Sequence, residues 1–119
     1  MTASRVLLIL LRVLIAIQLV LGITLWTGHG YGLLNVHRMS GMLFVLALWI
    51  LAIMTLAGRR HIGWSLFAIA WGLVIAAIGF MQVAIMPGDY HWVIKVIHLI
   101  VGMAAMPLAE HLVKGKVVT

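Results

Sequence analysis

Cysteine is absent from this chain of 119 residues, and charged side chains are scarce. Without cysteine the protein can form no disulfide, no thiolate metal site and no thioether bond to a cofactor. Only 8% of the residues are charged whereas 66% are hydrophobic, a balance that excludes an ordinary water-soluble domain. The composition therefore predicts an integral membrane protein.

Four apolar segments take up nearly the whole chain and leave no room for a second domain within residues 1–119. Each reaches the ~20 residues that span the hydrocarbon core of a bilayer, where a helix satisfies every backbone group internally. Because the connections are short, consecutive helices should be antiparallel neighbours. We therefore predict an all-α, up-down-up-down bundle of four transmembrane helices, approximately Val6–Trp26, Val36–Ala57, Ile62–Met86 and Trp92–Val113.

The basic residues predict the orientation of this bundle. Arg38 and Lys95 fall towards one side of the membrane. The other six fall on the side of both termini, which the positive-inside rule makes cytoplasmic: Arg5, Arg12, Arg59, Arg60, Lys114 and Lys116. We expect a multi-pass protein of a bacterial or organellar inner (plasma) membrane. The cations are scattered over helix ends rather than gathered in a patch, so nucleic acid is not an expected partner.

Two histidines stand near the start of apolar helices, each four residues ahead of a glycine, in the motifs His37-x-x-x-Gly41 and His98-x-x-x-Gly102. A histidine in a membrane span is costly and therefore a functional candidate. A glycine one turn further along the same face removes the side chain that would fill the space beside the imidazole. Two such faces leave a flat apolar slot with one axial ligand on each side, which suits a haem.

The two motifs also align with each other when the second half of the sequence is aligned with the first, so that His98 matches His37 and Gly102 matches Gly41. This weak repeat predicts two hairpins of the same orientation, related by an axis along the membrane normal. His37 and His98 then enter the membrane from the same side and reach a similar depth. We expect them to ligate one b-type haem from opposite faces.

Arg38 adjoins His37 in the sequence, and Lys95 lies one helical turn before His98. These two cations match the two propionates of a haem whose carboxylates point outward. Alternatively, both side chains simply extend to the membrane interface.

The remaining histidines are weaker candidates. His29 and His91 lie in or beside the outer loops, where they are alternative ligands, a second metal site or plain polar surface. A second haem would require His61 and His111 to face each other at the cytoplasmic ends. The spacing of His111 from His98 turns it away from the same seam, so one haem is expected rather than two.

Several other residues have predicted structural roles. Gln18 and Gln82 are either hydrogen-bonding ties between helices or partners of a quinone carbonyl, and Arg12 and Glu110 are expected to pair. Three glycines permit close approach of helices and suggest a homo-oligomer: Gly22, Gly72 and Gly79.

A family resemblance adds to these patterns. The run Gln18-x-x-x-Gly22, a glycine-rich loop and then Val36-His37-Arg38, followed later by Gln82, a Pro-Gly turn and His98, resembles one half of haem A synthase. In that family each half is a four-helix bundle with one haem between histidines of its second and fourth helices. The resemblance covers most of the chain and implies that His37 and His98 are the haem ligands. The chain resembles, less closely, the small membrane b-type cytochromes that exchange electrons with quinone.

The chain departs from the synthase pattern in two places. Leu34 stands where the catalytic half of the family carries a glutamate, three residues before the first histidine, and the outer-loop cysteine pair has no counterpart. The resemblance therefore implies the half that retains a b-type haem rather than the half that hydroxylates one.

Three functional hypotheses follow. The first is a membrane b-type cytochrome that carries electrons or holds haem, with quinone or a protein as its redox partner. The second is a non-redox membrane transporter or assembly factor whose histidines bind a metal ion or protons. The third is a haem-modifying enzyme, a haem-dependent membrane oxidoreductase, which Leu34 disfavours.

Overall fold

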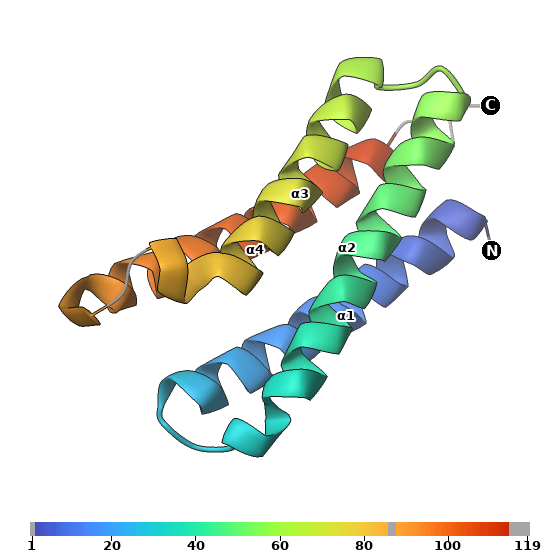
Figure 1. The fold of residues 1–119 in the computed structure, drawn as a ribbon. Coiled ribbons are helices and arrows are strands. Elements are labelled where there is room, and N and C mark those ends of the chain that lie inside the picture. Colours follow the sequence, from blue (N-terminus) through green and yellow to red (C-terminus); the bar gives the residue numbers. More distant parts are fainter. Residues whose placement is uncertain (1, 86–87, 115–119) are drawn as a thin grey trace.

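The computed structural model describes residues 2–85 and 88–114, and this part of the chain is helical (Figure 1). Its long helices are α1 (Ala3–Trp26), α2 (Leu34–Ala57), α3 (Ile62–Ile85) and α4 (His91–Val113). Short 3-10 turns at Tyr31–Leu33 and Gly88–Tyr90 precede α2 and α4. The predicted helix boundaries agree with these to within a few residues. The predicted end of the third helix, Met86, lies outside the described residues.

All four helices are long and apolar enough to cross a membrane, as the composition predicts. Large hydrophobic side chains also cover the outside of the molecule. Val20 is 66% exposed and Ile100 is 61% exposed, and many others on every helix resemble them. An exposed apolar surface of this extent marks contact with lipid. The fold is therefore that of an α-helical membrane protein.

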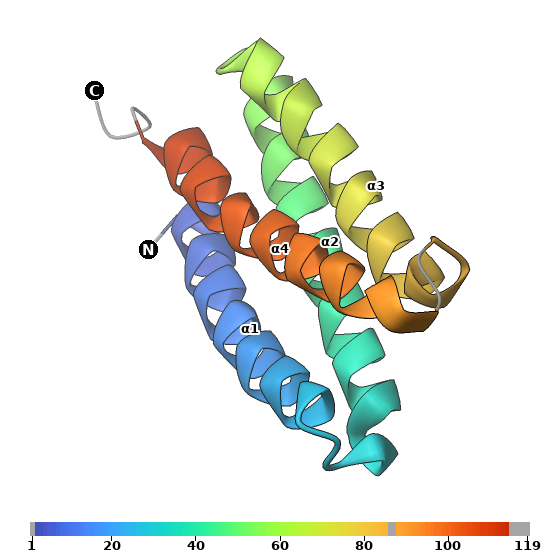
Figure 2. The same cartoon turned by 90° about the vertical axis from the view of Figure 1, so that its left-hand side faces the viewer.

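The helices form an elongated bundle of 52 × 25 × 17 Å. Each packs against the next in sequence, α1 also packs against α4, and α2 contacts α4 across the bundle. Figure 1 shows that α1 begins and α4 ends at the same end of the molecule as the α2–α3 turn, and we call this the terminal end. The opposite end, which we call the loop end, carries residues 27–33 and 88–90 (Figure 2).

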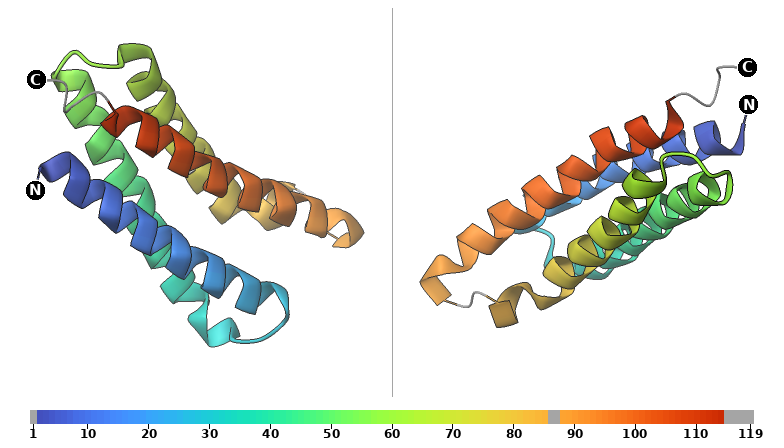
Figure 3. Two further views of the ribbon diagram at one scale, coloured as in Figure 1. Left: turned by 180° about the vertical axis from the view of Figure 1, so that it is seen from behind. Right: turned by 90° about the horizontal axis from the view of Figure 1, so that it is seen from above.

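The hydrophobic core is not spread evenly along the bundle. Apart from Ile94, the buried hydrophobic residues lie at the midpoint of their helices or nearer the terminal end, with Leu11, Leu48 and Leu112 fully buried. Towards the loop end the α1–α2 and α3–α4 hairpins diverge (Figure 3). The terminal half is thus held by close apolar packing, whereas the loop half, where both motif histidines lie, contains one of the described buried hydrophobic residues, Ile94.

Polar ties between helices confirm one prediction and add others. Arg12 donates to Glu110 from Nε at 3.0 Å and from a terminal nitrogen at 2.7 Å, so the expected pair joins α1 to α4. The Trp49 indole N–H donates to the Ile69 carbonyl of α3 at 3.1 Å. To reach it, the indole lies against Gly72, so close that a Cβ on that residue would collide with the ring. Such bonds matter because lipid offers no alternative acceptor.

Candidate functional site

His37 and His98 face each other between α2 and α4. His37 lies in the first turn of α2 and His98 in the second turn of α4, both in the half of the bundle nearer the loop end. Their ring centroids are 6.5 Å apart, and the ring planes are inclined at 77°. The structure therefore brings together the two histidines that the sequence motifs single out.

Each of these imidazoles holds a polar atom that the protein leaves unsatisfied. The Nδ1 atoms of His37 and His98 are buried without a hydrogen-bond partner, and within residues 2–85 and 88–114 no other side-chain nitrogen or oxygen atom has this property. A buried polar group without a partner costs free energy, so native proteins rarely retain one. Two such atoms on facing rings make this pair a candidate binding site for a ligand.

The separation of the rings can be compared with what one metal ion requires. With metal–nitrogen bonds of about 2 Å, two imidazoles on opposite sides of one metal have centroids about 6 Å apart. The observed 6.5 Å is close to that value. Among the described residues no three His, Cys, Asp or Glu side chains group to hold a metal ion, so a metal at this pair would have only the two imidazoles from this set. A porphyrin would supply the four others, and the donor set fits a haem better than a bare ion.

The glycines that lie against the imidazoles are on the other two helices. A Cβ placed on Gly79 of α3 would come within 3.1 Å of His98 Cε1, and one on Gly22 of α1 within 3.6 Å of His37 Cε1. The sequence marks both glycines as positions of close approach but carries no signal for the residue that faces them. In the structure each clears the space beside one histidine of the pair.

The two motif glycines, in contrast, do not lie against the imidazoles. A Cβ on Gly41 would meet the Gln18 side-chain oxygen at 3.1 Å, so Gln18 lies over that position, whereas a Cβ on Gly102 would meet nothing within 4 Å. Contact of Gly41 and Gly102 with a cofactor stays a prediction.

Gln18 ties α1 to the start of α2. Its side-chain amide donates to the His37 carbonyl at 3.0 Å and to the Ser40 hydroxyl. Ser40 in turn donates to the Val36 carbonyl at 2.7 Å. The interhelical role expected for Gln18 is confirmed, and its partners fix the backbone that carries His37. Sequence reasoning missed Ser40, whose hydroxyl gives no signal by itself. The Gln82 side chain lies outside the described part of the chain.

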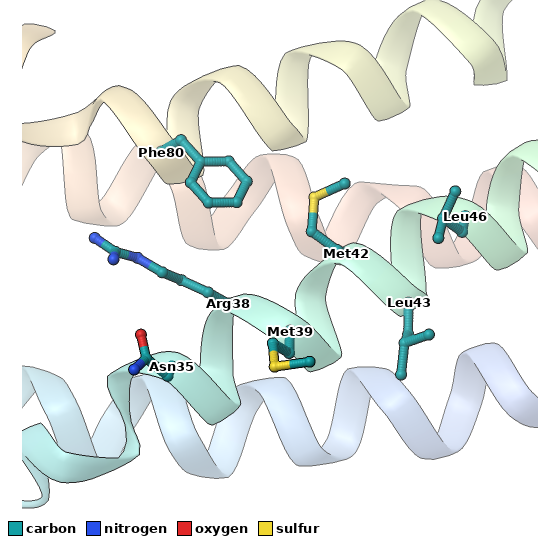
Figure 4. Close-up of a pocket in the computed structure, with 7 residues that line it drawn as sticks. All are labelled: Asn35, Arg38, Met39, Met42, Leu43, Leu46 and Phe80. Carbon is teal, nitrogen blue, oxygen red and sulfur yellow. The ribbon is translucent and has the colours of Figure 1, made fainter.

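Arg38 projects into a groove between α2 and α3. Figure 4 shows Arg38 and Met42 extending from α2 towards the helix that carries Phe80. Asn35 also lines the groove, and the rest of its wall is apolar: Met39, Leu43 and Leu46.

Lys95 lies on the other side of the site, where its ammonium group is 5.8 Å from the centroid of the Trp26 ring at the end of α1. This is a cation–π contact. Arg38 therefore reaches towards α3 and Lys95 towards α1. Two cations on opposite flanks suit two separate carboxylates, but their binding to propionates stays a prediction.

The remaining histidines divide into two kinds. His29 is exposed, with Nδ1 3.3 Å from the Thr27 hydroxyl, and His91 is the first residue of α4. At the terminal end, His61 and His111 contact each other with ring centroids 4.8 Å apart. Sequence reasoning turned His111 away from the haem seam and missed this contact. The distance is shorter than the roughly 6 Å that two ligands on opposite sides of one iron need.

No family model, curated protein or solved structure matches the chain. The resemblance to haem A synthase therefore rests on its short motifs alone.

Proposed function

We propose that this protein is a membrane b-type cytochrome that binds one haem between His37 and His98. The observation that carries the proposal is the pair of facing imidazoles, 6.5 Å apart, each with a buried and unpartnered Nδ1. A bound haem would supply a one-electron couple, whose potential the two histidines and the apolar surroundings would tune.

The residues around the pair have distinct tasks in this proposal. His37 and His98 bind the iron, and Gly22 and Gly79 leave space at the edges of their rings. Gln18 positions the backbone of His37 through its hydrogen bond to the carbonyl. The close-packed terminal half holds α2 and α4 together and so limits how far the two imidazoles can move apart.

Electron transfer is favoured over haem modification because Leu34 replaces the glutamate that the resemblance associates with the hydroxylating half. A bare metal ion is less favoured, because the described residues place no third His, Cys, Asp or Glu beside the pair, whereas protein zinc sites have three or four such ligands.

The proposed setting is an inner (plasma) membrane of bacterial or organellar type. The four helices would cross it up-down-up-down, with the terminal end cytoplasmic and the two hairpins as pseudo-repeats. The basic residues support this orientation, since Arg5, Arg59 and Arg60 all lie at the terminal end. Lys116 lies outside the described residues. Quinone or a redox protein would complete the electron path.

The test is the absorption spectrum of protein purified after expression with ample haem. We expect one b-type haem per chain and a sharp low-spin α-band on reduction, as two histidine ligands give. A colourless protein would overturn the proposal, and binding of Zn²⁺ or Cu²⁺ at the same histidines by that protein would favour the metal-handling hypothesis.

A further inference from the structure

A second group of chemically distinctive side chains lies at the terminal end, between α3 and α4. An apolar groove there is lined by aromatic, small and aliphatic residues together with one imidazole: Trp64, Phe67, Ala104, Pro107, Leu108 and His111. Trp64 is 51% exposed and Phe67 is 46% exposed, so the groove opens on the surface that would face lipid. It lies about 20 Å from the His37–His98 pair, as judged from the helical rise between His98 and His111.

His61 lies next to the groove, against the ring of His111. Its ring lies 4.8 Å from that of His111, and His111 lies 5.2 Å from Trp64. The Nε2 atom of His61 donates to the Lys114 carbonyl at 3.1 Å, which ties the α2–α3 turn to the end of α4. His61 has a φ of 44°, in the left-handed region that side chains other than glycine rarely adopt. The turn thus holds a second imidazole at the mouth of the groove.

The charged residues near His61 and His111 determine which kind of ligand this end of the groove would bind. Two histidines could ligate a divalent cation, but Arg59, Arg60 and Lys114 flank them in the sequence and would repel it. Within the described residues the one carboxylate of this end, Glu110, already pairs with Arg12 at 2.7 Å. A cluster of cations without a free carboxylate selects an anion.

We propose that this groove binds an anionic phospholipid, with the phosphate at the His61–His111 mouth and an acyl chain along the aromatic wall. Basic pockets between transmembrane helices on the cytoplasmic side are suited to anionic lipid headgroups. A free phosphate would use the cations but leave the apolar groove without a role, whereas a phospholipid uses both. This site is independent of the haem.

The test is native mass spectrometry of protein released from detergent containing equal amounts of phosphatidylglycerol and phosphatidylcholine. We expect phosphatidylglycerol to be retained roughly thirtyfold over phosphatidylcholine, the order of effect expected for two surface cations. Ala104→Leu should abolish the preference by filling the groove, and Arg59→Gln with Arg60→Gln should abolish it by removing charge. The double variant keeps the test decisive if Ala104→Leu fails to fold.

Matched controls lie on α1. Ala16→Leu adds the same bulk to an exposed alanine, and Arg5→Gln removes a cation from the same end of the molecule. Both should keep the wild-type preference. Equal retention of the two lipids by the wild type would overturn the proposal, as would an equal loss in Arg5→Gln, which would mean diffuse attraction. Displacement of phosphatidylglycerol by millimolar inorganic phosphate would also overturn it in favour of a free-phosphate site.

Discussion

At the scale of single residues, His37 and His98 combine two features that are costly without a ligand. They are polar side chains within apolar helices, and each keeps one buried ring nitrogen without a hydrogen bond. In lipid no water compensates such an atom. Coordination of a metal ion by an imidazole nitrogen would fix both rings and leave the other nitrogen to be oriented by its neighbours. The two residues should therefore be equally indispensable.

We expect His37→Ala or His98→Ala to lose haem or to convert a low-spin spectrum to high-spin, because one iron ligand is missing. Absorption spectra of the reduced and oxidised proteins measure this. His29→Ala and His91→Ala are controls from the loop end and should keep the wild-type spectrum. A normal bis-histidine spectrum in either His37→Ala or His98→Ala would show that the pairing is wrong.

Gly79 permits a sharper test of the same site. A Cβ there would approach His98 Cε1 to 3.1 Å, whereas one on Gly63 of the same helix would meet nothing within 4 Å. We expect Gly79→Ala to displace the His98 ring and to reduce haem occupancy or shift the α-band. Gly63→Ala should leave both unchanged. Equal haem content and identical spectra in the two variants would contradict the assigned contact.

At the scale of helices, packing is decided by pairs of a large and a small residue on neighbouring elements. The Trp49 indole of α2 lies across Gly72 of α3, where it reaches the Ile69 carbonyl. The three glycines that suggested self-association, Gly22, Gly72 and Gly79, each face a side chain of the same molecule. A homo-oligomer stays a prediction, and these glycines do not supply its surface.

We expect Gly72→Ala to destabilise the protein by about 1–3 kcal/mol, the usual effect of overpacking a filled site. The added methyl group collides with the indole of Trp49 and breaks its hydrogen bond to Ile69. Thermal unfolding in detergent, followed by circular dichroism, measures the change. Gly63→Ala is the matched control, and stability equal to that control would argue against the contact.

At the scale of the whole molecule, the bundle has a half with a packed core and a half in which the two hairpins diverge (Figure 3). The buried leucines hold the helices together at the terminal end, and the hairpins diverge where the two histidines lie (Figure 1). A cofactor bound there would tie the two hairpins together. Binding to the folded state alone also raises stability by mass action, so unfolding temperature should increase with haem loading.

The orientation in the membrane is open to a direct test, because the chain contains no cysteine that would react in the background. We expect Gly32→Cys and Asp89→Cys, at the loop end, to react with an impermeant maleimide only from outside the cell. Lys114→Cys, at the terminal end, should react only in inverted vesicles. Labelling of Gly32→Cys from the cytoplasmic side would overturn the proposed topology.

Much of this fold could be predicted from the sequence because membrane helices are specified locally. The four helices follow from runs of apolar residues of the right length, and their ends lie within a few residues of the predicted ones. The pairing of Arg12 with Glu110 was predictable because both charges occur at a similar depth in an apolar medium. The pairing of His37 with His98 follows from the same reasoning.

Only the tertiary structure decided how the helices are rotated against one another. It places Gly22 and Gly79, rather than the motif glycines, against the imidazoles. It also places the Gln18 side chain over Gly41 and the ring of His61 against that of His111. Spacing along one helix determines which residues share a face, but not which face of a neighbour it meets. That choice depends on the rotation and tilt that pack all four helices at once, for which a single segment carries no signal.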